Sequence, residues 1–488
     1  MSSNRYVPTR DSLRTHAVPD WYHDAKLGIF IHWSVSSVPA FAPRGDLMDV
    51  FTGGGQAASP YAEWYWNSLK LEGSAVQRHH REVYGDRPYP SFAADFRDGL
   101  AQWHPEDWAQ RFREAGARYV VLVTKHHDGF CLWPSEVAHP NASWKNWNTG
   151  RDVVGELASS VRAEGMRFGV YYSGGLDWTF EPRPVRTLVE VLTRVPGGAY
   201  PDYAAAQVRE LIERVSPDVL WNDISWPEGL ERLCSLVADY YHAVPEGVIN
   251  DRWTHRTALL WLLRFPPVRM LADALLTRQI RKQGGFLGAP PPALYDYRTP
   301  EYASFPEIQR GKWECVRGMD KSFGFNRNSR PEDFLTHEDL LHSFVDIVSK
   351  NGNLLLNVGP RGEDAQIPEI QLERLRWLGA FLEVNGDAIY GTRPWRRAEG
   401  TTREGIEVRF TERAGALYAT LLGTPSSRSV TFVDVPVAEP AFVRQLGSDS
   451  PPRVRREGDG DLRVEIPGAW ADRPAHAFRL GPVTGHGV

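Results

Sequence analysis

The amino-acid sequence predicts an α/β fold, a (β/α)8-like, TIM-type barrel followed by a C-terminal antiparallel β-sandwich. Apolar strand-like segments alternate with amphipathic helix-like segments through residues 1–390, and polar residues gather at the ends of those strands, as in a barrel. Beyond this region the pattern changes to short alternating strands. A chain of 488 residues is too long for one compact core. We therefore predict a barrel domain over residues 1–390 and a sandwich domain over residues 391–488.

The barrel prediction depends on a repeated strand–helix unit. Strands are predicted at 28–33, 119–123, 167–173, 218–223 and 247–252, and a further apolar segment lies at 351–360. Helices are predicted at 107–116, 154–164, 203–215, 228–243 and 369–384. Such units form a parallel sheet with right-handed crossovers, and five or more of them over roughly 200 residues favour a closed barrel over an open sheet.

The segment Tyr119–Trp133 carries the most information. Its first five residues are apolar and mostly β-branched, as in a strand buried on both faces. Lys125, His126, His127 and Asp128 follow directly, at the strand end where α/β folds place ligand sites. The alternative is a polar turn that leaves the core, since Asp-Gly is a common turn pair. The four ionisable side chains together favour a ligand site.

Other predicted strands also end in polar side chains. The side chains at these ends are His32, His126, His127, Tyr171, Asp223 and Arg252. In a closed barrel the C-terminal ends of the strands surround one mouth, so we expect these side chains to line one pocket.

Carbohydrate is one kind of ligand that the composition fits. Aromatic residues make up 12% of the chain and include 18 tryptophans. Aromatic faces stack on the apolar faces of sugar rings, but large aromatic side chains also fill large cores. Composition alone leaves both interpretations open.

Hydrolysis of a glycosidic bond uses two carboxylates that flank the bond. Asp223 ends an apolar strand and is the candidate nucleophile; its alternative role is to cap the helix that follows. Asp128, Asp251, Glu63 and Glu301 also lie near predicted strand ends. Spacing alone does not choose between Glu63 and Glu301 as the second carboxylate.

A metal site is the alternative use of the paired histidines. Barrel metallohydrolases use a His-x-His pair on one strand face, whereas His126 and His127 are adjacent and point in opposite directions if the strand stays extended. The sequence contains no Cys–His cluster and no His-Glu-x-x-His segment. We therefore expect no metal and no cofactor, and we expect histidines that bind hydroxyl groups.

Charge and hydropathy argue against several other partners. The net charge of −5 and the pI near 6.3 give no basic footprint for nucleic acid. The apolar stretch 258–276 is interrupted by arginine and proline, so we expect no membrane span. Three cysteines and an N-terminus without an apolar signal segment favour a cytoplasmic protein. A homo-oligomer is left open.

The sandwich prediction comes from the C-terminal region. Ile406, Val408 and Phe410 alternate with polar residues, and Gly, Pro, Ser and Asp separate such short segments. This pattern is typical of antiparallel strands with one buried face. We place the boundary between the domains near Gly391.

Seven motifs link the chain to a known family. They are Trp21–Trp33, Val38–Arg44, Glu63–Asn67, Thr124–Trp133, Asp218–Asp223, Val348–Pro360 and Asn385–Thr392. Each motif alone is weakly specific, but together they are highly specific and cover most of the chain. The sequence resembles the retaining α-L-fucosidases of glycoside hydrolase family 29.

This resemblance implies a somewhat irregular (β/α) barrel with a β-sandwich. It implies hydrolysis of terminal α-L-fucosyl residues from a fucosylated oligosaccharide or glycoconjugate, with net retention and without a metal. Asp223 is implied as the nucleophile and Glu301 as the acid/base, with Glu63 in reserve. The implied fucose pocket consists of His32, Glu63, Trp64, His126, His127, Tyr171, Trp221, Arg252 and Phe325.

The chain departs from the family pattern around this pocket. Ser34 and Ile224 stand where a glycine is usual, Ser322–Phe325 replaces a Ser-Trp-Gly-Tyr motif, and region 253–292 looks longer and more apolar. These changes leave the aglycone preference and the sugar open. Two alternatives follow: a catalytically inactive fucose- or carbohydrate-binding protein on this scaffold, or a related retaining glycosidase for a galacto-configured sugar.

Overall fold

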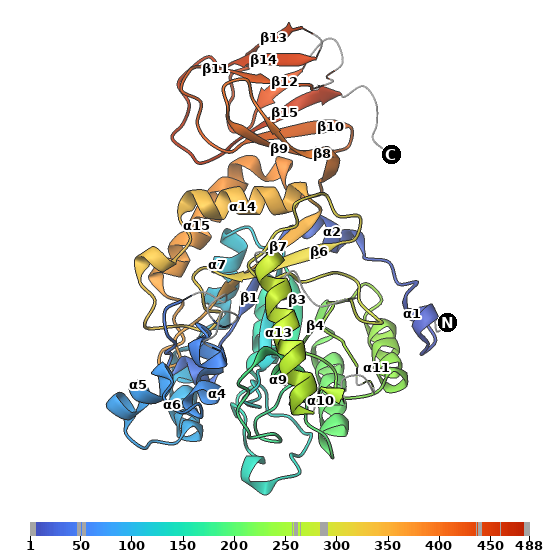
Figure 1. Ribbon diagram of the computed structural model, residues 1–488. Coiled ribbons are helices and arrows are strands. Elements are labelled where there is room, and N and C mark those ends of the chain that lie inside the picture. Colours follow the sequence, from blue (N-terminus) through green and yellow to red (C-terminus); the bar gives the residue numbers. More distant parts are fainter. Residues whose placement is uncertain are drawn as a thin grey trace.

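A computed structural model of the chain describes residues 6–45, 50, 55–255, 257, 262–263, 265–283, 291–435, 437, 442–458 and 460–482. Figure 1 shows a parallel sheet surrounded by helices and, at one end of it, a smaller unit of antiparallel strands. These are the barrel and the sandwich that the sequence predicts.

Seven parallel strands form the barrel sheet, in the order β5-β4-β3-β2-β1-β7-β6. Their bounds are β1 Leu27–Ile31, β2 Tyr119–Lys125, β3 Arg167–Ser173, β4 Val219–Asp223, β5 Val248–Ile249, β6 Trp313–Gly318 and β7 Gly352–Val358. Nearly all of these residues are buried, because helices cover the outer face of the sheet while side chains fill the inner one. Each predicted strand is present, and β6 is an additional one.

Helices connect the strands. Their bounds are α1 Arg10–Leu13, α2 Asp20–Ala25, α4 Tyr65–Leu69, α5 Ala75–Tyr84, α6 Phe92–Gly99, α7 Pro105–Glu114, α8 Val153–Ala163, α9 Leu188–Thr193, α10 Tyr200–Val215, α11 Leu230–Ala243, α13 Pro266–Gln283, α14 His337–Ser349 and α15 Glu369–Asn385. Asp152 caps the N-terminus of α8 and Thr336 caps that of α14, and each side chain accepts a backbone N–H of the first turn. The predicted helices correspond to α7, α8, α10, α11 and α15.

The segment 296–302 occupies the eighth position of the barrel, between β5 and β6. The backbone N–H of Asp296 donates to the carbonyl of Ile249 in β5 at 2.9 Å. A parallel bridge joins Glu301 to Val316 in β6. This segment therefore closes the ring without being a regular strand, and it carries Glu301 to the mouth.

The interior of the barrel is packed rather than hollow. The buried side chains of its inner cluster are Tyr22, Ala25, Phe30, Tyr119, Val121, Val123, Tyr171, Val219, Trp221, Val248, Tyr297, Val316, Phe323 and Leu355. A ligand can therefore reach the strand ends only from the mouth.

Two antiparallel sheets form the C-terminal sandwich, one in the order β12-β15-β10-β9-β8 and one in the order β11-β14-β13. Their strands are β8 Arg393–Thr401, β9 Glu407–Arg413, β10 Ala416–Leu421, β11 Ser429–Phe432, β12 Val443–Gln445, β13 Arg453–Glu457, β14 Asp461–Glu465 and β15 His476–Pro482. Val408 and Phe410 are buried in the core between the sheets, as their alternation predicts.

Helices α14 and α15 lie between the barrel sheet and the sandwich (Figure 1). Arg409 of β9 binds Asp346 of α14 at 2.6 Å, and Lys350 binds Glu399 of β8 at 2.6 Å. These ion pairs join the two parts of the chain.

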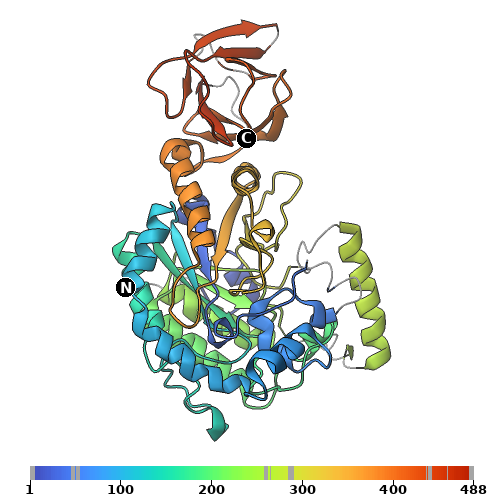
Figure 2. The ribbon, with the colours of Figure 1, turned by 90° about the vertical axis from the view of Figure 1, so that its left-hand side faces the viewer.

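Helix α13 belongs to the predicted insertion 253–292. It stands at one side of the barrel domain, away from the sandwich (Figure 2). Residues 256, 258–261, 264 and 284–290 of this insertion lie outside the described residues. Within the described part of the chain, no helix has both the length and the apolar character needed to cross a bilayer.

Candidate active site

The candidate site lies where β1 to β5 end. His32 follows β1, His126 and His127 follow β2, Tyr171 lies in β3, Trp221 and Asp223 lie in β4, and Arg252 follows β5. The fold thus brings the predicted strand-end side chains to one mouth, as parallel strands in a barrel require.

Asp223 is at the centre of this group. Its Oδ2 accepts a hydrogen bond from the Tyr171 hydroxyl at 2.7 Å, and its Oδ1 binds Arg252 Nη1 at 2.9 Å. Burial raises the pKa of Asp223, but the charge of Arg252 and the Tyr171 hydroxyl together hold the pKa below its usual value. The side chain is therefore an ionised carboxylate at neutral pH, which is the form a nucleophile needs.

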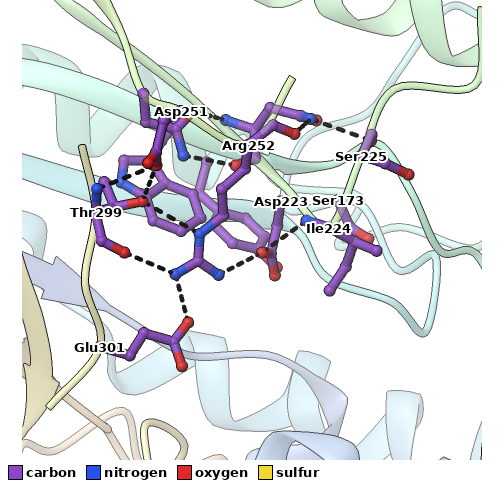
Figure 3. A network of polar contacts seen from close by, with 12 residues as sticks. Ser173, Asp223, Ile224, Ser225, Asp251, Arg252, Thr299 and Glu301 are labelled. Atoms are coloured by element: carbon purple, nitrogen blue, oxygen red, sulfur yellow. Dashed lines mark hydrogen bonds and ion pairs between the residues drawn. The ribbon is translucent and has the colours of Figure 1, made fainter. Parts of the chain in front are cut away.

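Arg252 bridges two carboxylates. Its Nη2 binds Glu301 Oε1 at 2.5 Å while its Nη1 binds Asp223, so Figure 3 shows the guanidinium between the two acids. The hydroxyl of Tyr61 donates to the other oxygen of Glu301 at 3.3 Å. The two carboxylates therefore face one region of space at the mouth.

The segment that closes the barrel also holds Arg252 in place. The Nη2 of Arg252 donates to the carbonyl of Thr299 at 3.4 Å. Asp251 accepts the Thr299 backbone N–H at 3.0 Å and its hydroxyl at 2.5 Å. Asp251 thus fixes the segment against which Arg252 is placed.

The two adjacent histidines do not point in opposite directions, because the chain leaves the extended conformation before them. The pairing of β2 with β3 shifts register between Val123 and Lys125. The ring centroids of His126 and His127 lie 4.0 Å apart, and His127 Nε2 lies 3.7 Å from Asp223 Oδ2. Both rings therefore reach the site from consecutive positions.

Hydrogen bonds fix which ring nitrogen carries the proton in His32 and in His127. His32 Nδ1 lies 2.6 Å from the Oδ1 of Asn357, which can only accept. His127 Nδ1 lies 2.6 Å from the Ser173 hydroxyl, which itself donates to the carbonyl of Leu176. In both histidines the Nε2 is left as an acceptor.

The same histidines are uncharged. Burial lowers the pKa of His32 to about 4. It lowers the pKa of His126 and of His127 well below the usual value, and His32, Lys125 and Arg252 add to the effect for His127. Neutral rings suit hydrogen bonds to hydroxyl groups.

Glu63 lies in the 3-10 turn Ala62–Trp64. Its Oε2 accepts the backbone N–H of Gly324 at 2.7 Å and the Ser322 hydroxyl at 3.4 Å. Burial raises the pKa of Glu63 to about 8 although the Gly324 N–H opposes the shift. Glu63 therefore carries a proton at neutral pH and can donate a hydrogen bond.

Aromatic rings surround the polar groups. The ring of Trp64 meets His127 edge to face, with centroids 4.9 Å apart. The ring centroids of Phe323 and His32 lie 5.0 Å apart. Phe325 is half-buried, and its ring faces Arg327 at 5.4 Å. The first phenylalanine of the Ser322–Phe325 motif is thus the one that packs against His32.

Ile224, which stands where glycine is usual, has a φ of +69°. A β-branched residue rarely adopts this left-handed backbone conformation, whereas glycine does so freely. The Ile224 backbone N–H donates to Asp223 Oδ1 at 2.8 Å. The chain keeps this hydrogen bond despite the less favourable residue.

Lys125 and Asp128 support the histidine turn from outside the pocket. Lys125 Nζ binds the buried Asp177 at 2.7 Å, and the next residue, Trp178, donates its backbone N–H to the carbonyl of His127 at 2.8 Å. Asp128 accepts the Tyr89 hydroxyl at 2.8 Å and the Phe130 N–H at 3.1 Å. Both residues fix the backbone of the turn.

Across the residues that the structure describes, no group of three or more His, Cys, Asp or Glu side chains is placed to hold a metal ion. The chemistry that the described site offers is that of two carboxylates around a cation, with neutral hydrogen-bonding groups beside them.

Sequence reasoning overlooked Tyr61, Thr299 and Phe323. Tyr61 sits two residues before Glu63, and Phe323 sits between two motif residues. The types and spacing of Tyr61 and Phe323 do not distinguish them from aromatic residues of the core. Only the fold places Tyr61 beside Glu301 and Phe323 beside His32.

Known proteins resemble this chain over nearly its whole length. A family model described as Alpha-L-fucosidase matches residues 1–387. An alpha-L-fucosidase from Branchiostoma floridae is 33% identical over 486 residues, which covers 96% of this chain and 93% of that protein. The human tissue alpha-L-fucosidase is 31% identical over 483 residues, covering 95% of this chain and 88% of its own.

A solved structure agrees. The crystal structure of Thermotoga maritima alpha-fucosidase in complex with a mechanism-based inhibitor has 38% sequence identity and a TM-score of 0.81, and the match covers 98% of this chain and 100% of that one. The chain therefore belongs to the alpha-L-fucosidases of glycoside hydrolase family 29.

Proposed function

We propose that the protein is a retaining, exo-acting α-L-fucosidase that releases terminal α-L-fucosyl residues from fucosylated oligosaccharides or glycoconjugates by double displacement. The observation that carries this proposal is the pair Asp223 and Glu301, both bound to Arg252. Retaining glycosidases keep their two carboxyl groups roughly 5–5.5 Å apart, a span that the two terminal nitrogens of one guanidinium suit.

In the first step the Asp223 carboxylate attacks the anomeric carbon of fucose. The bond from that carbon to the leaving oxygen breaks, and protonated Glu301 gives its proton to the leaving oxygen. Arg252 binds both carboxylates and so holds the nucleophile and the acid/base in position relative to one another.

In the second step water takes the place of the leaving group. Glu301, now a carboxylate, removes a proton from the water, which attacks the anomeric carbon and releases Asp223. While Asp223 is held as an ester it carries no charge, so Arg252 stabilises the Glu301 carboxylate alone. One cation thus supports both steps.

The remaining side chains suit a sugar with three hydroxyls and a methyl group. The Nε2 atoms of His32 and His127 accept hydrogen bonds from hydroxyls, and protonated Glu63 donates one. His126 adds a third neutral ring to this group. Because packed side chains fill the barrel below the site, only the end of a glycan fits.

Trapping the intermediate tests the nucleophile. In a 2-fluoro-fucosyl fluoride the fluorine on C2 disfavours the oxocarbenium-like transition states of both steps, but the good fluoride leaving group keeps the first step fast enough for the ester to accumulate. We expect peptide mapping by mass spectrometry to find the sugar on Asp223. A label on another carboxylate would overturn the assignment.

Azide rescue tests the acid/base. With an activated aryl fucoside, Glu301→Ala still forms the ester but hydrolyses it slowly, and we expect azide to restore turnover and yield fucosyl azide. Glu63→Ala is the matched control and gives no rescue. Rescue of Glu63→Ala alone would transfer the role to Glu63.

Two outcomes with the wild type would favour the alternative functions. Faster turnover of aryl galactoside than of aryl fucoside would overturn the choice of sugar. Binding of fucose without any turnover would indicate an inactive binding protein.

A further inference from the structure

A buried glutamate lies inside the barrel, away from the groups assigned to the reaction. Glu314 lies on β6, and its side chain is fully buried. Its Oε2 accepts the hydroxyls of Tyr22 at 2.8 Å and Tyr119 at 2.5 Å, and its Oε1 accepts the indole N–H of Trp221 at 3.3 Å. The proposed reaction gives this carboxylate no part.

Trp221 links this carboxylate to the groups that hold Asp223. Its ring stacks on Tyr171, with centroids 5.3 Å apart and planes 20° from parallel. The guanidinium of Arg252 lies over the same ring at 4.7 Å, within cation–π distance. Tyr171 and Arg252 are the two side chains that bind the Asp223 carboxylate.

We propose that Glu314 is a positioning residue for Asp223 that acts through the indole of Trp221. The inference rests on the proposed function of Asp223 as the nucleophile. A directional hydrogen bond to a carboxylate oxygen fixes the orientation of the indole within its plane more firmly than packing alone. The fixed ring then presents one face against which both Tyr171 and Arg252 are aligned toward Asp223.

Burying a carboxylate in a packed interior is costly, so Glu314 needs a reason to be there. Burial raises the pKa of Glu314 to about 7, while the two tyrosine hydroxyls, the Trp221 N–H and the charge of Lys312 oppose the rise. An apolar side chain would fill the same space without this cost but would leave the indole N–H and both tyrosine hydroxyls unpaired. Of these three donors, Trp221 is the one that contacts the groups around Asp223.

The test compares Glu314→Gln with Tyr22→Phe. Both variants alter the same buried cluster, but only Glu314→Gln weakens the acceptor of the indole. We expect Glu314→Gln to lower kcat on an aryl fucoside by about 10- to 100-fold, since small misplacements of reacting groups have effects of this size, with little change in KM. We expect the acid limb of its pH–rate profile to move to higher pH, because a loosened Arg252 no longer holds the pKa of Asp223 down. In Tyr22→Phe the acid limb stays where it is in the wild type.

Two further measurements keep the outcomes distinct. Titration of Asp223 by 13C NMR in labelled protein needs no activity, and we expect a raised pKa in Glu314→Gln and in Trp221→Phe but not in Tyr22→Phe. The double variant Glu314→Gln/Trp221→Phe should lose no more kcat than Trp221→Phe alone, because Glu314 is proposed to act through Trp221. An unchanged Asp223 titration in Glu314→Gln, or losses that add in the double variant, would overturn the inference. A wild type inactive on every fucoside would refute the proposed function instead, and the NMR titration would still decide the role of Glu314.

Discussion

The end of β4 and the turn Ala62–Trp64 each bury one carboxylate at the barrel mouth, and the two carboxylates differ in charge. Asp223 is 8% exposed and Glu63 is 5% exposed. Each accepts one backbone N–H, from Ile224 at 2.8 Å and from Gly324 at 2.7 Å. Yet the pKa of Asp223 lies below its usual value, whereas that of Glu63 is raised to about 8.

The neighbouring charge explains the difference. Burial raises the pKa of both groups, but Arg252 binds Asp223 directly and outweighs it. Near Glu63 the charges that act on its pKa are those of Asp320 and Glu301, which raise it further. At this mouth a cation rather than depth decides which carboxylate is ionised, and the proposed roles of nucleophile and hydrogen-bond donor follow from that.

The largest effect should come from removing the ionised member. Asp223→Asn keeps the shape of the side chain but removes the charge and the nucleophile, so we expect kcat on an aryl fucoside to fall by about 10⁴-fold or more. Circular dichroism should show an unchanged fold. A loss smaller than about 100-fold would contradict the assignment. An enzyme without its nucleophile keeps only the rate that substrate binding contributes, and that rate is far lower.

Removing the cation should make Asp223 resemble Glu63. In Arg252→Met the pKa of Asp223 is no longer held down, so we expect the acid limb of the pH–rate profile to move up by about 1–3 pH units. The rate should also fall by about 100-fold, since the charge is placed where it acts in both steps. Arg327→Met is the matched control, because Arg327 pairs with Glu363 at 2.8 Å on the surface. An acid limb that stays in place in Arg252→Met would refute the role of the cation.

Much of the barrel could be predicted from the sequence. Apolar runs such as Tyr119–Val123 predict the barrel strands because buried parallel strands tolerate few polar residues. The segment 296–302 could not be predicted in this way. It reads Asp-Tyr-Arg-Thr-Pro-Glu-Tyr, which has no apolar run and contains a proline, yet hydrogen bonds to β5 and bridges to β6 place it in the sheet. Contacts with distant strands, not local preference, determine this element.

The candidate site, like the fold, could be predicted only in part from the sequence. Strand-end position identifies Asp223 and Arg252 as neighbours because it depends only on the register of parallel strands. The bend that brings His126 and His127 together depends on an irregular pairing with β3, and the bridge from Arg252 to Glu301 depends on the closing segment. Neither appears as a pattern within a short stretch of residues.

A smaller effect should come from the protonated member. Glu63→Gln keeps a donor at the same place, so we expect a loss in kcat/KM of less than about tenfold near pH 6.5, the cost of one altered hydrogen bond. The wild type should lose activity as pH rises through about 8, where Glu63 gives up its proton, and this loss should be reduced in Glu63→Gln. Profiles measured from pH 6 to 9.5 decide the matter, and parallel alkaline limbs in the two proteins would show that the proton on Glu63 is not needed.

The smallest effect concerns Ile224, whose backbone N–H donates to Asp223. Ile224 has a φ of +69°, a strain of about 1–3 kcal/mol for a non-glycine residue, whereas glycine adds about 0.5–1 kcal/mol of chain entropy. Ile224→Gly retains the N–H that donates to Asp223. We therefore expect its free energy of unfolding, measured in urea, to stay within about 1 kcal/mol of the wild type, with the acid limb of the rate profile unmoved. Ile406→Gly is the control, since Ile406 is also half-buried but is not among the positive-φ residues, and it should lose about 2 kcal/mol or more. Equal losses in the two variants would mean that Ile224 is not strained, and a shifted acid limb in Ile224→Gly would mean that its side chain, as well as its N–H, helps to keep Asp223 ionised.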